Sequence, residues 1–378
     1  MEKIVVISDS FKGTISSRQI CQIAGSSIPA FFPECNVVSI PVADGGEGTV
    51  ACFLEAIDAV PVTIPTTGPY EELIEATYAR SGDRAIIEMA SAAGLPMVGE
   101  RRNPAVTTTF GVGSIIRHAI ENGCREILLG LGGSATNDGG CGCAAALGVK
   151  FFDKTGKEFI PVGSTLNRIA RIDSSKADIL LNGVEVTVMC DVENPLYGTT
   201  GAAYIFGPQK GADPDMVQLL DDNLRALDSV LQRELKIYIA DIPGAGAAGG
   251  MGAGCMAFLH AQLKSGIDAV LDMVSFDTLV RGADLVITGE GRIDSQSIRG
   301  KVISGIAKRT SKRNVPLVAI VGSIDDSAQA AYDLGVTAMF GIDREAVAFE
   351  TYAHKSAEQY RKTLEDVLRL IKAVWLKK

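Results

Sequence analysis

The stretch GLGGSATNDGG, residues 130–140, decides how this chain is interpreted. The apolar residues 126–129 before it are typical of a short buried strand, and the small residues 141–147 after it are typical of a closely packed helix. Glycine permits positive φ and lets an anion approach the main chain. A helix N-terminus adds N–H groups without an acceptor and a partial positive charge. The stretch therefore predicts a phosphate-binding loop, and a tight turn whose glycines serve only geometry is the alternative.

Strands followed by a polar loop and a helix occur near both ends of the chain. This alternation indicates a parallel sheet with right-handed crossovers. The strands are expected at residues 3–8, 35–41, 283–288, 315–321 and 336–340. Helices are expected at about 17–31, 213–235, 325–334 and 356–375.

The middle of the chain has a different pattern. Residues 62–64, 73–78 and 84–88 predict consecutive strands with no helix between them, which indicates a second sheet. The predicted fold class is therefore α/β with two domains. One is a discontinuous Rossmann/flavodoxin-like parallel-sheet domain of residues 1–67 and 276–378, and the other is an inserted α/β domain of mixed sheet, residues 68–275. Ligands favour the carboxyl ends of strands and interdomain clefts, so we expect the active site in the cleft between the domains.

Composition and charge exclude several classes of protein. The chain has 378 residues, a net charge of −9 and 47% hydrophobic residues. Nucleic acid is excluded as a partner, because neutralising its phosphates requires a basic face. No apolar run reaches the length of a membrane span, and Met1 is followed almost directly by a strand, so we expect no signal peptide and a cytoplasmic protein. The sequence leaves the oligomeric state open, a homodimer included.

The eight cysteines and three histidines do not form a metal-binding pattern. The only close pair of cysteines is Cys141 and Cys143, no CxxC occurs, and the histidines are isolated. A zinc site is not expected, and the thiols are typical of a protein in a reducing cytosol.

Two glycine-rich stretches supply candidate nucleotide-binding residues. The first is residues 130–140, and the second is residues 244–249, which match GxGxxG but follow a doubtful strand. A closely packed helix start explains the second stretch equally well. The candidates for contact with nucleotide phosphates are Gly132, Gly133, Ser134, Thr136, Asp138, Gly246 and Gly249.

Carboxylates beside glycines at strand ends are candidates for Mg²⁺, which proteins hold through one or two carboxylates together with substrate phosphates. Glu290 and Asp294 flank Arg292, and Asp44 and Glu47 lie among three glycines. Capping of the following helices is the competing explanation for each carboxylate. Glu290 and Asp294 are the predicted metal ligands.

Two further residues are candidates for the chemical step. Lys12, beside a glycine at the end of the first strand, suits a phosphate, although a surface lysine is the alternative. Asp191 follows an apolar strand, and its carboxylate could accept the proton of an acceptor hydroxyl, as the acidic base does in phosphoryl transfer. A turn-forming Asp is the alternative for Asp191.

Six stretches together resemble the glycerate kinase type I family, in the family's order and over nearly the whole chain. They are SDSFKGT (8–14), ADGGEGT (43–49), GLGGSATNDGG (130–140), CDVENPL (190–196), PGAGAAGG (243–250) and TGEGRID (288–294). The resemblance implies transfer of the γ-phosphoryl group of ATP to a hydroxyl of D-glycerate, with Mg²⁺, in a protein of two α/β domains around a cleft.

With such a reaction in view, the candidate residues take definite roles. Lys12 would neutralise charge on the transferring phosphoryl group and Asp191 would deprotonate the hydroxyl. The glycerate carboxylate would meet Arg292, and the other substrate-binding candidates are Ser10, Asp44 and Glu47. Two alternatives remain at this stage: a kinase of another small hydroxy acid, and a non-enzymatic nucleotide-binding sensor. The sequence also leaves open whether the product is 2- or 3-phosphoglycerate.

Overall fold

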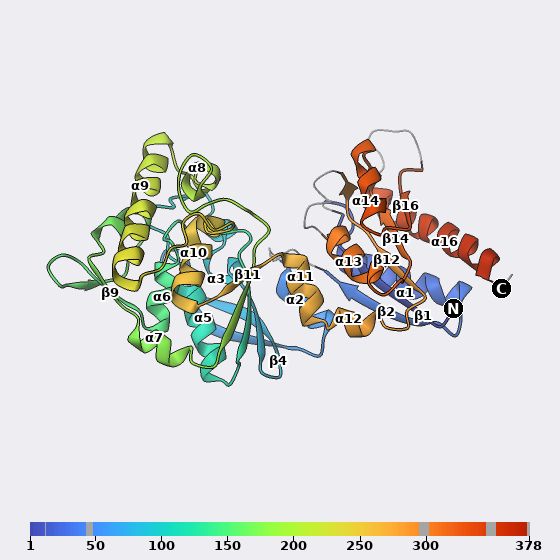
Figure 1. Cartoon of the computed structure of the whole chain (residues 1–378), viewed down its shortest axis with the longest axis horizontal. Helices are drawn as coiled ribbons and strands as arrows, with labels where there is room; N and C mark the ends of the chain where they lie inside the picture. Colours follow the sequence, from blue (N-terminus) through green and yellow to red (C-terminus); the bar gives the residue numbers. More distant parts are fainter. Residues whose placement is uncertain (12, 43–47, 295–301, 345–352, 376–378) are drawn as a thin grey trace. The chain divides into compact units, whose positions relative to one another are not determined.

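The computed structural model describes residues 1–11, 13–42, 48–294, 302–344 and 353–375 (Figure 1). The chain forms two compact units. The first unit contains Met1–Asp44, Glu55–Ile57 and Ser265–Lys378, and the second contains Gly45–Leu54 and Asp58–Lys264. Within the described residues, no helix is both long and apolar enough to cross a membrane.

The first unit is built on a five-stranded parallel sheet in the order β16-β14-β12-β1-β2. If these five strands are renumbered 1 to 5 in chain order and the sheet is read from β2, the order is 2-1-3-4-5. This is the order of flavodoxin-like folds. The strands are β1 (Lys3–Ser8), β2 (Asn36–Pro41), β12 (Leu285–Thr288), β14 (Leu317–Val321) and β16 (Ala338–Gly341), and β13 (Arg292–Ile293) pairs separately with β15 (Ser323–Ile324).

Helices α1 and α16 pack together and share one hydrophobic core with this sheet. Helix α1 begins where the sequence predicts, because Ser16 and Gln19 form a capping box. The helices of the first unit are α1 (Ser17–Phe31), α11 (Gly266–Met273), α12 (Phe276–Leu279), α13 (Val302–Ser311), α14 (Ala330–Asp333) and α16 (Ser356–Trp375). The helix predicted at 325–334 is instead a 3₁₀ turn, Asp326–Gln329, followed by the single turn of α14.

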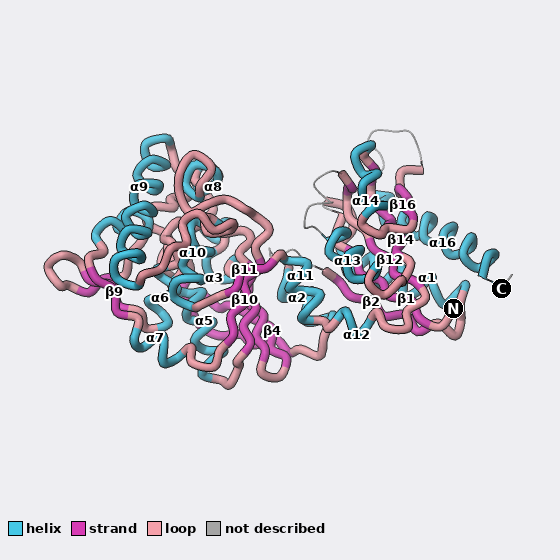
Figure 2. The backbone as a smooth tube through the Cα atoms, viewed as in Figure 1, coloured by secondary structure: helices cyan, strands magenta, loops and turns pink. Residues whose placement is uncertain are grey.

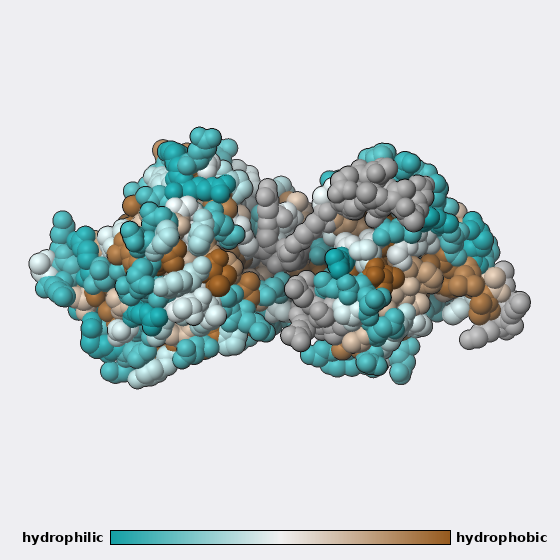
Figure 3. Space-filling model, turned by 90° about the horizontal axis from the view of Figure 1, so that it is seen from above, coloured by the Kyte–Doolittle hydropathy of each residue, from teal (hydrophilic) through white to brown (hydrophobic). Residues whose placement is uncertain are grey.

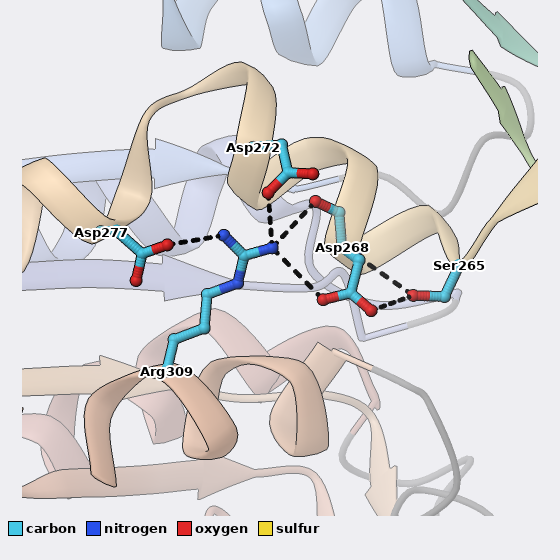
Figure 4. A network of polar contacts seen from close by, with 5 residues as sticks. All are labelled: Ser265, Asp268, Asp272, Asp277 and Arg309. Atoms are coloured by element: carbon cyan, nitrogen blue, oxygen red, sulfur yellow. Dashed lines mark hydrogen bonds and ion pairs between the residues drawn. The ribbon is translucent and has the colours of Figure 1, made fainter. Parts of the chain in front are cut away.

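One arginine links three elements of the first unit (Figure 4). Arg309 on α13 is 13% exposed and contacts Asp268 and Asp272 on α11 and Asp277 on α12, at 3.3, 2.7 and 3.1 Å. Ser265 Oγ accepts from the Asp268 N–H and caps α11. The network therefore holds α11 and α12 against α13.

The second unit is built on a six-stranded mixed sheet in the order β11-β10-β6-β5-β4-β3 (Figure 2). Strands β5, β6, β10 and β11 are parallel, whereas β3, β4 and β5 pair antiparallel. The strands are β3 (Val60–Thr67), β4 (Leu73–Ser81), β5 (Arg84–Glu88), β6 (Glu126–Gly130), β10 (Glu185–Met189) and β11 (Gln262–Lys264). A separate sheet joins β8 (Glu158–Phe159), β7 (Lys150–Phe152) and β9 (Arg171–Asp173), and β7 and β8 form a hairpin within it.

Small side chains let the helices of the second unit pack closely. A Cβ at Gly113 on α5 would lie 2.2 Å from the Cys143 carbonyl oxygen on α6, so α5 and α6 touch through their backbones. The helices are α2 (Thr49–Ala56), α3 (Ala90–Ala93), α4 (Leu95–Val98), α5 (Phe110–Glu121), α6 (Cys141–Leu147), α7 (Ser175–Leu180), α8 (Ala202–Phe206), α9 (Pro214–Val230) and α10 (Ala247–Leu259).

The limits of the two units differ from the predicted boundaries at 67/68 and 275/276. Strand β3 pairs with β4 along its whole length, from Val60 with Arg80 to Thr67 with Leu73, so residues 60–67 belong to the second sheet. Strand β11 pairs with β10, and the second unit therefore ends at Lys264. The first difference arises because the predicted boundary at 67/68 divides the β3–β4 hairpin, whose strands are neighbours in sequence. The second comes from the pairing of β10 with β11, which are distant in sequence, so local patterns do not carry it.

Exposed apolar side chains are scattered over the surface. Figure 3 shows small hydrophobic areas among mostly hydrophilic residues on the face that it presents. On α16, Leu370, Val374 and Trp375 are exposed by 59, 59 and 39%.

Candidate active site

The main chain is open at the start of the glycine loop. Strand β6 ends at Gly130, and Gly133 is exposed with φ of +75°, the left-handed backbone that favours glycine. Among the described residues, the main-chain N–H groups of Gly132, Gly133 and Ser134 have no hydrogen-bond acceptor. This open main chain, at the carboxyl end of a parallel strand, can bind the oxygens of a phosphate.

The remainder of the loop is buried and structural. Asp138 is 0% exposed; its Oδ2 accepts from Thr109 N, Thr109 Oγ1 and Gly142 N, and its Oδ1 accepts from Gly140 N. Burial raises the pKa of Asp138, and these hydrogen bonds oppose the rise. The carboxylate thus joins the N-termini of α5 and α6. The Thr136 side chain is also fully buried, so neither predicted contact residue presents its side chain to a ligand in this conformation.

The second glycine-rich stretch packs against the first. A Cβ at Gly249 would lie 2.0 Å from the Thr136 carbonyl oxygen, and one at Gly246 would lie 2.2 Å from that of Pro195. The Gly139 N–H donates to the Gly249 carbonyl oxygen at 3.1 Å. These contacts match the closely packed alternative for residues 244–250, because both glycines are buried by neighbouring backbone.

A lysine that the sequence analysis does not assign lies against the glycine loop. The Nζ atom of Lys210 donates to Ser134 Oγ at 2.8 Å and to the Thr136 carbonyl oxygen at 2.7 Å. Lys210 is 2% exposed, and burial lowers the pKa of its amine to about 7, against an opposing effect of Asp138. Its position between glycines, in GPQKG (207–211), is the only local signal that could have singled it out.

Two carboxylates flank the base of the loop. Gly130 is paired in register with Glu88 on β5 and with Met189 on β10, and Asp191 follows β10 two residues later. Asp191 is exposed, and its neighbour Cys190 makes the last ladder bond, to the Lys264 carbonyl oxygen. The Val50 N–H donates to Glu88 Oε1 at 2.5 Å. The parallel strands therefore bring Asp191 and Glu88 to the edge that carries the loop, although the sequence analysis singled out only Asp191.

In the first unit, loops after β1 and β12 meet at the carboxyl edge of the sheet. The Asp9 N–H donates to the Gly289 carbonyl oxygen at 2.9 Å, and the Ser10 N–H donates to Asp9 Oδ1 at 2.6 Å. The Glu290 side chain is 7% exposed, and its carbonyl oxygen accepts from the Gly322 N–H. Backbone contacts thus place Ser10 and Glu290, both predicted site residues, on adjoining loops.

Arg292 forms an ion pair on the same unit. Its Nη2 lies 2.5 Å from Asp325 Oδ2, and its side chain is 64% exposed. Hydrogen bonds from Ser327, and then the Arg292 guanidinium, lower the pKa of Asp325 to about 2. Asp294 follows β13, and its backbone neighbour Ile293 accepts from the Asp325 N–H.

The described residues hold no group of three or more His, Cys, Asp and Glu side chains arranged to bind a metal ion. Glu290 and Asp294 offer oxygen ligands, which fit Mg²⁺ bound through one or two carboxylates and completed by phosphate oxygens and water. Three predicted site residues, Lys12, Asp44 and Glu47, lie outside the described residues.

An open glycine loop and a buried lysine, both on an α/β scaffold, are features typical of phosphate-binding α/β proteins. The sequence matches the glycerate kinase family over residues 4–372, and the chain belongs to that family. It is 43% identical to a glycerate kinase of Bacillus cereus (strain ATCC 10987 / NRS 248), covering 99% of this chain and 98% of that one. It is 45% identical to the glycerate 2-kinase of Escherichia coli (strain K12), covering 90% of each.

The fold agrees with these relatives. A crystal structure of a Salmonella typhimurium LT2 protein assigned as glycerate kinase 2 superposes with a TM-score of 0.88, at 40% identity and 99% coverage of both chains. The α/β fold with one parallel and one mixed sheet is therefore that of a glycerate kinase.

Proposed function

We propose that this chain, a kinase of glycerate, transfers the γ-phosphoryl group of ATP to the 2-hydroxyl of D-glycerate, giving 2-phosphoglycerate and ADP. The observation that carries the proposal is the match to relatives named glycerate kinase over nearly the full length of the chain. The position of transfer follows the name of the Escherichia coli relative. The six matching stretches support placing the chain in the type I branch of the family, and its small water-soluble substrates support a cytoplasmic location.

The phosphates of ATP would bind at the open main chain of residues 132–134. Phosphoryl transfer requires mainly positioning and stabilisation of charge, because the transferring group resembles metaphosphate. Mg²⁺, held by Glu290 and Asp294, would neutralise charge on the phosphate oxygens. Lys12 would neutralise charge on the transferring phosphoryl group.

Glycerate would be bound and activated by charged side chains at the strand ends. Asp191 is exposed, and its carboxylate would take the proton of the acceptor hydroxyl. We propose that the guanidinium of Arg292, which pairs with Asp325 through Nη2, binds the carboxylate of glycerate. Ser10, Asp44 and Glu47 are the remaining proposed contacts of the substrate.

The product identifies both the activity and the position of transfer. Purified protein is incubated with ATP, Mg²⁺ and D-glycerate, and ¹H and ³¹P NMR spectra are compared with those of authentic 2- and 3-phosphoglycerate. We expect a phosphorus coupled to the single proton on C2. Coupling to the two protons on C3 would overturn the 2-hydroxyl assignment, and absence of ADP would overturn the kinase assignment.

A further inference from the structure

We propose that Lys210 is a positioning residue for nucleotide binding: its buried amino group holds residues 134–136 and supplies the positive charge beside the phosphate-binding main chain. The proposal rests on the proposed function, because it assigns the nucleotide phosphates to residues 132–134. It concerns a residue that touches the loop and not the substrate.

The backbone around Lys210 directs its side chain inward. Residues Pro208–Lys210 form a 3₁₀ turn that ends at Gly211, whose φ of +97° reverses the chain. The Lys210 N–H donates to the Gly207 carbonyl oxygen at 2.9 Å. A Cβ at Gly207 would lie 2.3 Å from the carbonyl oxygen of Ala203. This turn is too tight for larger residues at the glycines, and it fixes where the long side chain of Lys210 enters the fold.

The glycine loop is held from two sides. On one side, the Leu95 N–H donates to the Gly133 carbonyl oxygen at 2.7 Å and the Ala135 N–H donates to that of Ala93 at 2.8 Å. On the other side, Lys210 Nζ makes its two hydrogen bonds to Ser134 and Thr136. The open N–H groups of residues 132–134 lie between these attachments, so loss of Lys210 frees one side of the segment that would bind phosphate.

Some buried polar atoms of the loop make no hydrogen bond to the described residues. Thr136 Oγ1 and both polar atoms of the Asn137 side chain are buried and have no hydrogen-bond partner among the described residues. Buried polar groups without partners are costly, and they are found where water or a ligand completes the site. These groups adjoin the Lys210 contacts, so the interior that Lys210 holds together contains polar atoms that a buried water can complete.

Charge gives the lysine a function that packing alone does not. The charge of Asp138 raises the pKa of the Lys210 amine and so opposes the effect of burial. Arg102 donates to the carbonyl oxygen of Gln209, the residue before Lys210. The next carboxylate, Asp213, accepts from Met216 N and caps α9. A polyanion bound nearby favours the charged amine, so nucleotide binding should draw protons onto Lys210.

The test compares Lys210→Met with Lys150→Met, which removes a lysine that pairs with Glu158 on the exposed hairpin. Calorimetry with ADP in two buffers of different ionisation enthalpy, at about pH 8, measures the Kd and the protons taken up. Circular dichroism confirms the fold. For Lys210→Met we expect an increase in Kd of about 10- to 100-fold, the effect of losing a charged hydrogen bond, and loss of the proton uptake that wild type and Lys150→Met share.

Each outcome decides one claim. Wild type that binds no ADP would overturn the proposed function itself. If folded Lys210→Met has the Kd and the proton uptake of wild type, the role of Lys210 is overturned and the proposed function is not. An increased Kd with unchanged proton uptake would also overturn the role of Lys210, because a purely structural role gives that result. If Lys210→Met does not fold, the wild-type protein decides alone: net uptake of protons supports the proposal, and its absence overturns it.

Discussion

Thr109 and Asp138 join the starts of two helices: Thr109 donates to Asp138 Oδ2 from both its N and its Oγ1, each at 2.8 Å. Thr109 Oγ1 also accepts from the Cys143 N–H at 2.8 Å, so one hydroxyl serves α5 and α6. Because Thr109 and Asp138 are both 0% exposed, water cannot replace these hydrogen bonds.

The first prediction concerns the stability that this pair contributes. Thr109→Val keeps the shape of the side chain and leaves Asp138 and the Cys143 N–H each short of one partner. We expect a loss of about 1.5–3 kcal/mol in the free energy of unfolding, measured by denaturant titration. Thr155→Val is the matched control, because Thr155 makes the same two bonds to Asp153 on an exposed turn, at 2.8 and 2.6 Å. Equal effects of the two substitutions would contradict the assignment.

The second prediction tests whether the open main chain of the glycine loop binds phosphate. At Gly133 a Cβ would meet only Ala90 Cβ, at 3.5 Å, so valine is opposed by the positive φ more than by lack of space. We expect Gly133→Val to weaken binding of a non-hydrolysable ATP analogue far more than Ser134→Ala, which removes one neutral hydrogen bond and costs roughly threefold to tenfold in affinity.

Gly156→Val separates backbone strain from loss of the ligand. Gly156 has φ of +82°, and a Cβ there would meet nothing within 4 Å. Both valine variants should lose about 1–2 kcal/mol of stability, yet only Gly133→Val should change the calorimetric Kd for the nucleotide. If folded Gly133→Val binds the analogue like wild type, the phosphates bind elsewhere.

The third prediction concerns the proposed base. Asp191→Asn keeps the size of the side chain and removes the carboxylate, so kcat should fall by roughly 10²–10⁴-fold, the range for loss of a general base. The Kd for ATP should stay close to that of wild type. Steady-state kinetics and calorimetry measure the two quantities, and a variant with nearly full kcat would show that Asp191 only forms a turn.

The fourth prediction concerns the metal ligands. Glu290→Gln and Asp294→Asn should each raise the Mg²⁺ concentration needed for half-maximal rate, because an amide is a weaker ligand for Mg²⁺ than a carboxylate. The coupled assay for ADP is run over a series of Mg²⁺ concentrations, and thermal unfolding controls for the fold. An unchanged Mg²⁺ dependence in both variants would remove the assignment.

The fifth prediction concerns the Arg309 network (Figure 4). Arg309→Met removes the cation among three carboxylates, and we expect a loss of about 1–3 kcal/mol in the free energy of unfolding. A second change, Asp272→Asn, should recover part of the loss by reducing repulsion among the carboxylates. Arg117→Met removes an exposed pair with Glu121, 51% exposed on each side, and should cost no more than about 0.5 kcal/mol. If Arg309→Met loses no more free energy of unfolding than Arg117→Met, the stabilising role of the network is contradicted.

Local sequence was enough to locate most of the secondary structure. The capping residue Ser16, the alternation of apolar and polar residues and the glycines after strands act over a few residues. The observed strands β1, β5 and β6 lie where these signals place them. The six motifs together were also enough to indicate the family, which the match over residues 4–372 confirms.

The roles within the glycine loop depended on distant contacts. The sequence GLGGSATNDGG shows a carboxylate at Asp138, but only the packing of α5 against α6 places Thr109 beside it and buries both. Likewise, the tight contacts of Gly246 and Gly249 are made with residues about 50 and 110 positions earlier, which no local pattern records.

By itself, then, the sequence determined most of the strands and the family, because these depend on residue types at short spacing, and it predicted phosphate binding by residues 130–140. The tertiary structure decided that β11 pairs with β10, that the side chains of Thr136 and Asp138 are buried, and that Lys210 reaches Ser134 across 76 positions. The physical reason is that burial, strand pairing and the low dielectric around an amine are properties of the folded neighbourhood, and residues far apart in sequence create it.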